Sequence, residues 1–363
     1  MQRIRYEDFF LLIGRENENA RAAEDMENIP CLCINHHDFS STIHRRRRYW
    51  SHVRSILHFS YGDKISKNLF SFASGFKLLR VLEFLQLQFP SFPDEIVKLF
   101  HLRYLACRIK HSGHSISLPP SISKLQNLQT LIVYTANAAV SRYFISLPSC
   151  PPRQKMNWCR HLQECLETVP NLKKLEVRYT QCDRYDKWQK YCLNNLVHLC
   201  QLETLHISFI LITGLIKFPD PFHRSFAFPL SLKKLSLYGC SLPWKDLSVV
   251  GSLPNLELLK LKYDSFVGKE WEPVEGEFLR LKFLLLEMLN VKCWRAENTH
   301  FPTLEHLEII ECSHLEDIPP EIPTLKLIEV KGSNLAGESA LRMQEEQRDM
   351  GNDTLQVRVF NYW

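Results

Sequence analysis

Cysteine and histidine residues lie close together at two places in the sequence, and this combination can bind zinc. The two places are Cys31–His37 (CLCINHH) and Cys159–Cys165 (CRHLQEC). Structural zinc sites usually combine two separated ligand pairs around a tetrahedral ion. On a helix Cys159 and His161 would point apart, and no second ligand pair is near them. Adjacent pairs such as Cys31 and Cys33 followed by His36 and His37 rarely form a tetrahedral set. We therefore predict no metal site and interpret these residues as parts of ordinary packing.

Glycine and nucleophile patterns argue against nucleotide chemistry and against catalysis. The chain has only 12 glycines in 363 residues, and it contains neither G-x-x-x-x-G-K-[ST] nor G-x-G-x-x-G. No local group of residues combines a nucleophile, a base and a side chain that would orient the base. We expect a non-enzymatic protein without a cofactor.

The overall charge is mild. The sequence has 45 Lys and Arg residues against 40 Asp and Glu residues, a formal charge of +5, which predicts no nucleic-acid partner. The run His44–Arg48 (HRRRR) fits a nuclear-import or phosphate-binding patch, and it also fits a solvated loop. Both interpretations of this run stay open.

The cysteines and the N-terminal stretch indicate a cytoplasmic protein. The 12 cysteines form no C-x-x-C pair, so we expect free thiols in a reducing compartment. The apolar run Phe9–Ile13 has acidic residues on both sides and is too short for a signal peptide or a membrane span. We predict no stable membrane insertion.

The elements that would position functional side chains are visible in Leu118–Val133 (LPPSISKLQNLQTLIV). From Ile122 to Leu131 an apolar residue occurs at every third position, and Val133 closes the run. Helices alternate intervals of three and four and strands use intervals of two, so neither explains a strict three. The run is typical of one coil of a leucine-rich repeat, whose apolar side needs similar coils beside it.

Ten such units recur along the chain, nine with the pattern L-x-x-L-x-apolar and the last, Leu325–Val330, with Ile328 in place of the second leucine. Their first leucines are 21 to 30 residues apart, except for one interval of 44 residues that begins at Leu128. The spacing predicts an α/β leucine-rich-repeat solenoid. It is a curved array with a parallel sheet on the concave face and irregular or short helical segments on the convex face. The units begin at Leu79, Leu102, Leu128, Leu172, Leu202, Leu232, Leu256, Leu281, Leu304 and Leu325.

We expect three parts in the chain. Residues 1–50 form a lead-in or a partial cap, residues 51–333 form the repeats, and residues 334–363 form a C-terminal cap. Within this cap Gly337–Met350 is expected to be a polar helix, and Leu355–Phe360 alternates like an edge strand. Prolines before several strands predict thin connections rather than full helices.

Function would lie in the outward positions of the strands, because parallel strands stack such side chains into ladders about 4.8 Å apart. We expect a basic and aromatic band at mid-array, with Tyr238 as an anchor for a protein partner, and an acidic end formed by Glu287, Glu308 and Glu329. The alternative is that these positions are polar simply because they are exposed to solvent and have no binding role. The band consists of Arg178, His206, Lys234, Tyr238, Lys260 and Lys262.

The pattern L-P-x-x-I-x-x-L-x-x-L-x-x-L at Leu118–Leu131 resembles the repeats of plant intracellular immune receptors, which join a nucleotide-binding switch to leucine-rich repeats. Other stretches are similar to the late blight resistance proteins of the nightshade family, and the resemblance covers most of the chain from Leu32 onward. These stretches are Ser51–Phe59, Phe76–Phe84, Asn127–Val133, Pro170–Val177, His314–Pro319 and Gln344–Asp353.

The resemblance implies a domain that recognises a pathogen effector or a guarded host protein, or that restrains a nucleotide-binding switch. The family also carries a coiled coil and a P-loop, and because neither motif occurs here we expect a truncated receptor. A second hypothesis is a generic leucine-rich-repeat adaptor, for example in ubiquitin transfer. An F-box-like segment in residues 1–50 would favour the adaptor, and none is evident.

Overall fold

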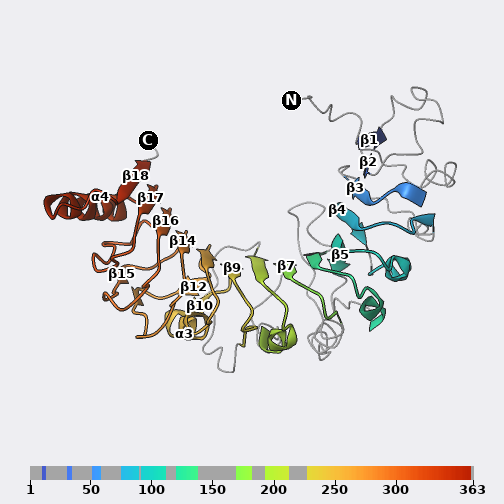
Figure 1. Ribbon diagram of the computed structural model, residues 1–363, viewed down its shortest axis with the longest axis horizontal. Coiled ribbons are helices and arrows are strands. Elements are labelled where there is room, and N and C mark those ends of the chain that lie inside the picture. Colours follow the sequence, from blue (N-terminus) through green and yellow to red (C-terminus); the bar gives the residue numbers. More distant parts are fainter. Residues whose placement is uncertain are drawn as a thin grey trace, which may run out of the picture. The chain divides into compact units, whose positions relative to one another are not determined.

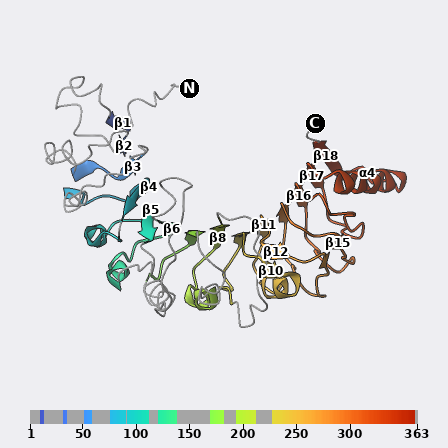
Figure 2. The same ribbon diagram turned by 180° about the vertical axis from the view of Figure 1, so that it is seen from behind.

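The computed structural model describes residues 10–13, 31–34, 51–58, 75–89, 91–111, 120–137, 169–181, 193–211 and 227–360. These residues form two compact units. The N-terminal unit extends to Gln181, and the C-terminal unit begins at Leu193. In each unit the strands lie side by side in one layer. The segments that connect them form a second layer, which we call the connecting layer (Figures 1 and 2).

The described part of the N-terminal unit contains seven strands, each parallel to the next. Two short 3-10 helices, η5 (Asp94–Lys98) and η6 (Pro120–Lys124), lie in the connections. The strands are β1 (Phe10–Ile13), β2 (Cys31–Ile34), β3 (Ser55–His58), β4 (Val81–Phe89), β5 (Tyr104–His111), β6 (Thr130–Asn137) and β7 (Lys174–Gln181).

The described part of the C-terminal unit has a main sheet of seven parallel strands. They are β8 (Thr204–Leu211), β9 (Lys234–Tyr238), β11 (Leu258–Lys262), β14 (Phe283–Glu287), β16 (His306–Ile310), β17 (Leu327–Lys331) and β18 (Gln356–Phe360). Two short parallel pairs lie in the connecting layer: β10 (Leu242–Pro243) with β12 (Phe266–Val267), and β13 (Glu270–Trp271) with β15 (Cys293–Trp294). The helical segments are η8 (Leu193–His198), η9 (Trp244–Leu247), α3 (Ser248–Gly251) and α4 (Asn334–Asp349).

The apolar residues at every third position form the inward side of one coil, as predicted. Ile122, Leu125, Leu128 and Leu131 are fully buried, and Val133 is 3% exposed. The backbone N–H of Leu125 donates to the carbonyl of Ile122, and that of Leu128 donates to Leu125, each at 2.9 Å. These turns of three residues explain the spacing of three. Parallel strands and stacked coils of this kind confirm the predicted leucine-rich-repeat fold.

A column of aromatic rings fills the connecting layer of the C-terminal unit. Trp271 stacks between Trp244 and Trp294, with ring centroids 5.0 and 4.9 Å away. Phe278 and Phe301 meet the same indole edge-on at 6.3 and 5.8 Å. Each such pair adds about 0.5–1.5 kcal/mol beyond the burial of its apolar area. The column therefore joins successive coils on the side away from the sheet.

The tail contains the helix and the edge strand that its sequence pattern indicates. Two serines of the tail bond to earlier coils: the hydroxyl of Ser333 accepts the Cys312 N–H at 2.9 Å, and that of Ser339 accepts the Ile318 N–H at 3.0 Å. Both serines are buried. The boundaries of the three parts stay predictions. Within residues 1–50, the expected lead-in or partial cap, β1 and β2 pair with the sheet.

Three features of the sequence lie outside the described residues. The first is the arginine run His44–Arg48. The second is residues 138–168, which lie within the interval of 44 residues, and the third is the group Cys159–Cys165 inside them. Of the cysteines and histidines in the other group, Cys31–His37, only Cys31 and Cys33 are described.

Candidate protein-binding face

Five of the six residues of the predicted band lie on three neighbouring strands of the C-terminal unit. The parallel register places His206 of β8 beside Ser236 of β9, and Ser236 beside Lys260 of β11. The same register pairs Tyr238 with Lys262. Along β9 and β11 the buried leucines alternate with outward side chains that are exposed or half-buried. Strand register therefore brings the expected residues together on one face.

Tyr238 does not stand alone on this face. Its ring stacks on Tyr263, with centroids 4.3 Å apart and an interplanar angle of 24°. Tyr263 is 38% exposed and has φ of +50° in the turn just after β11. That turn places the Tyr263 ring against Tyr238 on the neighbouring strand β9. The sequence pattern missed Tyr263 because the residue falls outside the repeating strand positions.

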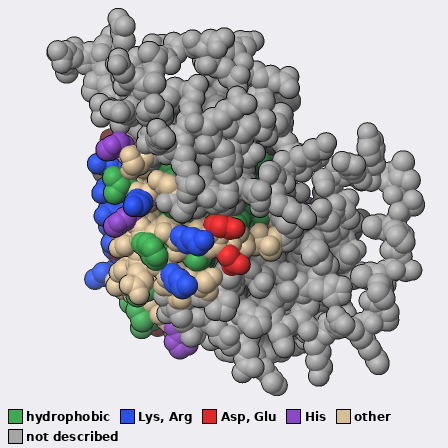
Figure 3. Space-filling model, turned by 90° about the vertical axis from the view of Figure 1, so that its right-hand side faces the viewer, with side chains coloured by type: hydrophobic (Ala, Val, Ile, Leu, Met, Phe, Trp, Pro, Cys, Tyr) green, Lys and Arg blue, Asp and Glu red, His purple; other side chains and the backbone are tan. Residues whose placement is uncertain are grey.

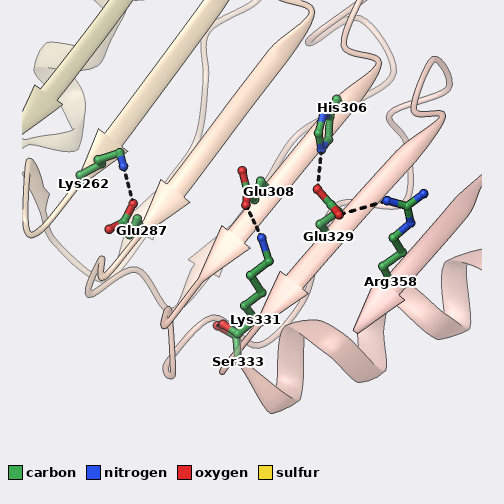
Figure 4. Close-up of polar contacts among 8 residues, drawn as sticks. All are labelled: Lys262, Glu287, His306, Glu308, Glu329, Lys331, Ser333 and Arg358. Carbon is green, nitrogen blue, oxygen red and sulfur yellow. Dashed lines mark hydrogen bonds and ion pairs between the residues drawn. The ribbon is translucent and has the colours of Figure 1, made fainter. Parts of the chain in front are cut away.

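Two lysines of the band have partners on the sheet. The Nζ atom of Lys262 lies 2.6 Å from a carboxylate oxygen of Glu287, as Figure 4 shows. The Nζ atom of Lys260 lies 5.5 Å from the ring centroid of Phe283, within range for a cation–π contact. Glu287 compensates the charge of Lys262, so Lys234 and Lys260 contribute most of the positive charge of this face in the C-terminal unit.

The three glutamates expected to form an acidic end are all paired with bases on the same face (Figure 4). Besides the pair at Glu287, the carboxylate of Glu308 lies 2.7 Å from the Nζ atom of Lys331. The carboxylate of Glu329 lies 3.3 Å from the His306 ring and 3.4 Å from the Arg358 guanidinium. The expectation of an acidic end is therefore wrong, because neighbouring strands bring Lys262, Lys331 and Arg358 to these glutamates.

Arg178, the remaining member of the band, lies in the N-terminal unit on β7. Its guanidinium lies over the ring of Tyr134, 4.4 Å from the centroid. The Tyr134 hydroxyl donates to Glu176 at 2.9 Å. Burial raises the pKa of Tyr134, and the nearby carboxylate adds to this effect. Arg178 is thus part of a local cluster on its own unit.

Some outward positions of the strands are covered. Ala106 is fully buried, Ile132 is 6% exposed and Leu285 is 3% exposed. Leu285 lies in register between Lys260 and Glu308, whose longer side chains can fold over it. These three positions are not accessible to a partner, although the strand pattern places them on the outward side.

Among the residues that the structure describes, no three His, Cys, Asp or Glu side chains are grouped so as to hold a metal ion. Within the same residues, no helix is both long enough and apolar enough to cross a membrane.

Stacked coils, most of them 21 to 30 residues long, each give one strand to a parallel sheet and bury their leucines, and this arrangement defines a leucine-rich-repeat protein. The chain is homologous over most of its length to putative late blight resistance protein homologs of Solanum demissum. One is 32% identical over 331 residues, which cover 81% of this chain and 25% of the relative. Another is 30% identical over 410 residues, which cover 97% and 30%. The chain thus spans between a quarter and a third of the length of these relatives.

The search for family models found no match. Among solved structures, the functional domain of InlJ from Listeria monocytogenes has a TM-score of 0.41 and 13% identity, covering 85% of this chain and 64% of that one. A leucine-rich-repeat protein from Leptospira interrogans has a TM-score of 0.31 and 15% identity, covering 86% and 91%.

Proposed function

We propose that this chain is the recognition region of a plant disease-resistance protein, which binds a protein partner without catalysing a reaction. The homology to late blight resistance protein homologs supports this proposal and favours it over the ubiquitin-transfer adaptor. The partner is a pathogen effector, a guarded host protein or a nucleotide-binding switch domain. We propose the cytoplasm as the place where it acts.

The tyrosine pair carries this proposal, because it lies on the sheet of the C-terminal unit with exposed Lys234 and half-buried Lys260. Tyr238 and Tyr263 already stack on each other, so their rings lose little conformational freedom when a partner binds. Tyrosine and nearby cations are the residue types that dominate the energy of protein interfaces. We propose that Tyr238, Tyr263, Lys234 and Lys260 form the centre of the contact, with His206 at its margin.

The test compares two double variants of the full chain in leaf tissue. Tyr238→Ala with Lys260→Ala removes one ring and one cation from the sheet face. Lys245→Ala with Lys269→Ala is the matched control, since both lysines are exposed and lie in the connecting layer. Partners crosslinked to the chain are quantified by mass spectrometry, and the affinity of each recovered partner is then measured with purified protein.

We expect the sheet-face variant to bind its partner at least tenfold more weakly, with an unchanged melting temperature, and the control to bind normally. Equal binding by both variants would refute the role of this face. Loss of binding by the control alone would move the contact to the connecting layer.

A further inference from the structure

A row of exposed and half-buried side chains runs along the edge of the sheet where the chain enters each strand. We call it the edge row. Each coil contributes the residue directly after the first leucine of its repeat, and the coil of β3 contributes the residue after Val53. In the C-terminal unit the row is Glu203, Lys233, Glu257, Lys282, Glu305 and Lys326. Each backbone N–H in the row donates to the carbonyl of the row residue before it, at 2.8 to 3.0 Å. Neighbouring coils therefore hold these side chains side by side.

Charges alternate along the edge row of the C-terminal unit, so every charge has an opposite neighbour. Lys233 lies 3.4 Å from Glu203, and Lys326 lies 2.9 Å from Glu305. The Lys326 ammonium lowers the pKa of Glu305 by a hydrogen bond and by its charge. This order is what stability alone would favour, because stacked strands place neighbouring side chains only about 4.8 Å apart.

The edge row of the N-terminal unit breaks this order. It consists of Arg54, Arg80, Arg103, Gln129 and Lys173, joined by the same backbone hydrogen bonds at 2.7 to 2.9 Å. All five residues are exposed. Its four cations form no ion pair with any residue in the described part of the chain. Three arginines in consecutive coils repel one another, so this row is arranged against the stability of the fold.

The surroundings of this basic row are also basic and carry exposed apolar side chains. Lys77 is exposed and lies a few residues before β4. Two apolar side chains are also exposed: Leu78, next to Lys77, by 41%, and Phe100, two residues before Leu102, by 59%. In the view of Figure 3, several Lys and Arg side chains gather along one edge of the described surface, and others lie beside the few acidic side chains. The row thus combines positive charge with accessible apolar contacts.

We propose that the edge row of the N-terminal unit binds an acidic segment of a partner protein. The segment lies extended across β3 to β7, with carboxylates on Arg54, Arg80 and Arg103 and apolar side chains on Leu78 and Phe100. Four strand intervals span about 19 Å, which six extended residues cover at about 3.3 Å each. This surface differs from the sheet face, so the inference goes beyond the proposed function.

The apolar contacts favour a peptide over a nucleic acid. The arginines and the exposed Phe100 ring suit a base or a carboxylate-bearing peptide. Leu78 adds an aliphatic surface, which stacked bases do not use and which an apolar side chain of a peptide can cover. An extended peptide that alternates acidic and apolar residues points its carboxylates to one side of the backbone and its apolar side chains to the other. One segment can therefore reach the arginines on one side and Leu78 and Phe100 on the other. The bound carboxylates would also relieve the repulsion among the arginines.

The test measures binding of the full chain to an eight-residue peptide of alternating glutamate and leucine with blocked ends, at low ionic strength. The same peptide with glutamine in place of glutamate is the control ligand, and an eight-nucleotide single-stranded DNA is the competing one. Arg80→Glu reverses the central charge of the row. Lys282→Glu is the matched variant, since it reverses the same repeat position in the C-terminal unit.

We expect Arg80→Glu to weaken peptide binding about tenfold and to keep or raise the melting temperature, because it creates the alternating order of the other unit. Lys282→Glu should lower the melting temperature and leave peptide binding unchanged. Binding should weaken several-fold between 50 and 500 mM salt, as roughly expected from screening. The proposal is overturned if the glutamate and glutamine peptides bind alike, if Arg80→Glu binds normally, or if the DNA binds more tightly than the peptide.

Discussion

The two serines that tie the C-terminal helix to the coils before it allow a stability prediction worked from the structure. Ser333 is 1% exposed and Ser339 is 4% exposed, and each hydroxyl accepts a backbone N–H that lies in the interior. Replacing either serine with alanine leaves that N–H without its partner. A buried donor left unpaired costs about 1–3 kcal/mol, which raises the local opening constant by about 5- to 150-fold.

The assay is hydrogen exchange at the two amides, followed in the variants Ser333→Ala and Ser339→Ala. Exchange should accelerate at Cys312 in the first variant and at Ile318 in the second, and the urea midpoint should fall in both. Ser313→Ala is the control, because Ser313 follows Cys312 directly and is exposed. If exchange at Cys312 is as slow in Ser333→Ala as in the control, the hydroxyl does not hold this amide and the reasoning fails.

Three further outcomes test the structure. Trp271→Ala should lower the free energy of unfolding by about 3–5 kcal/mol because it opens the aromatic column, with Trp271→Phe losing less, and a loss below about 1 kcal/mol would contradict the packing. Burial, with Glu83 beside it, raises the pKa of Tyr104 from 10.0 to about 12. The stability that Tyr104 contributes is therefore complete below pH 10 and is lost as the pH rises toward 12, so Tyr104→Phe should flatten the decline between these values in denaturation curves. Burial raises the pKa of Cys107 to about 12; peptide mapping should find it alkylated only after unfolding, whereas exposed Cys200 reacts in the folded protein.

The inward residues of the coils were predictable because their spacing depends on local geometry. Three-residue turns bring Ile122, Leu125 and Leu128 to the interior, and the strand after them continues with alternation. The alternating tail segment Leu355–Phe360 likewise matches the edge strand β18. Patterns of this kind are complete within about fifteen residues, so no knowledge of distant contacts is needed.

The outward face was predicted less well because its properties arise between coils. Alternation places Leu285 on the outward side, but the neighbouring strands bury it. Tyr263 completes the tyrosine pair from a turn that no strand pattern marks. Whether the six-residue band binds a partner stays a prediction.

The residue pattern alone was enough to predict that this chain forms leucine-rich coils, where each coil turns, and which side chains alternate outward. Which charges neutralise each other became clear from the folded chain. The glutamates at 287, 308 and 329 looked like an acidic end when read one coil at a time, and they are paired once the coils stack. An apolar spacing is a property of one coil, whereas an ion pair depends on which coil lies beside which and in what register.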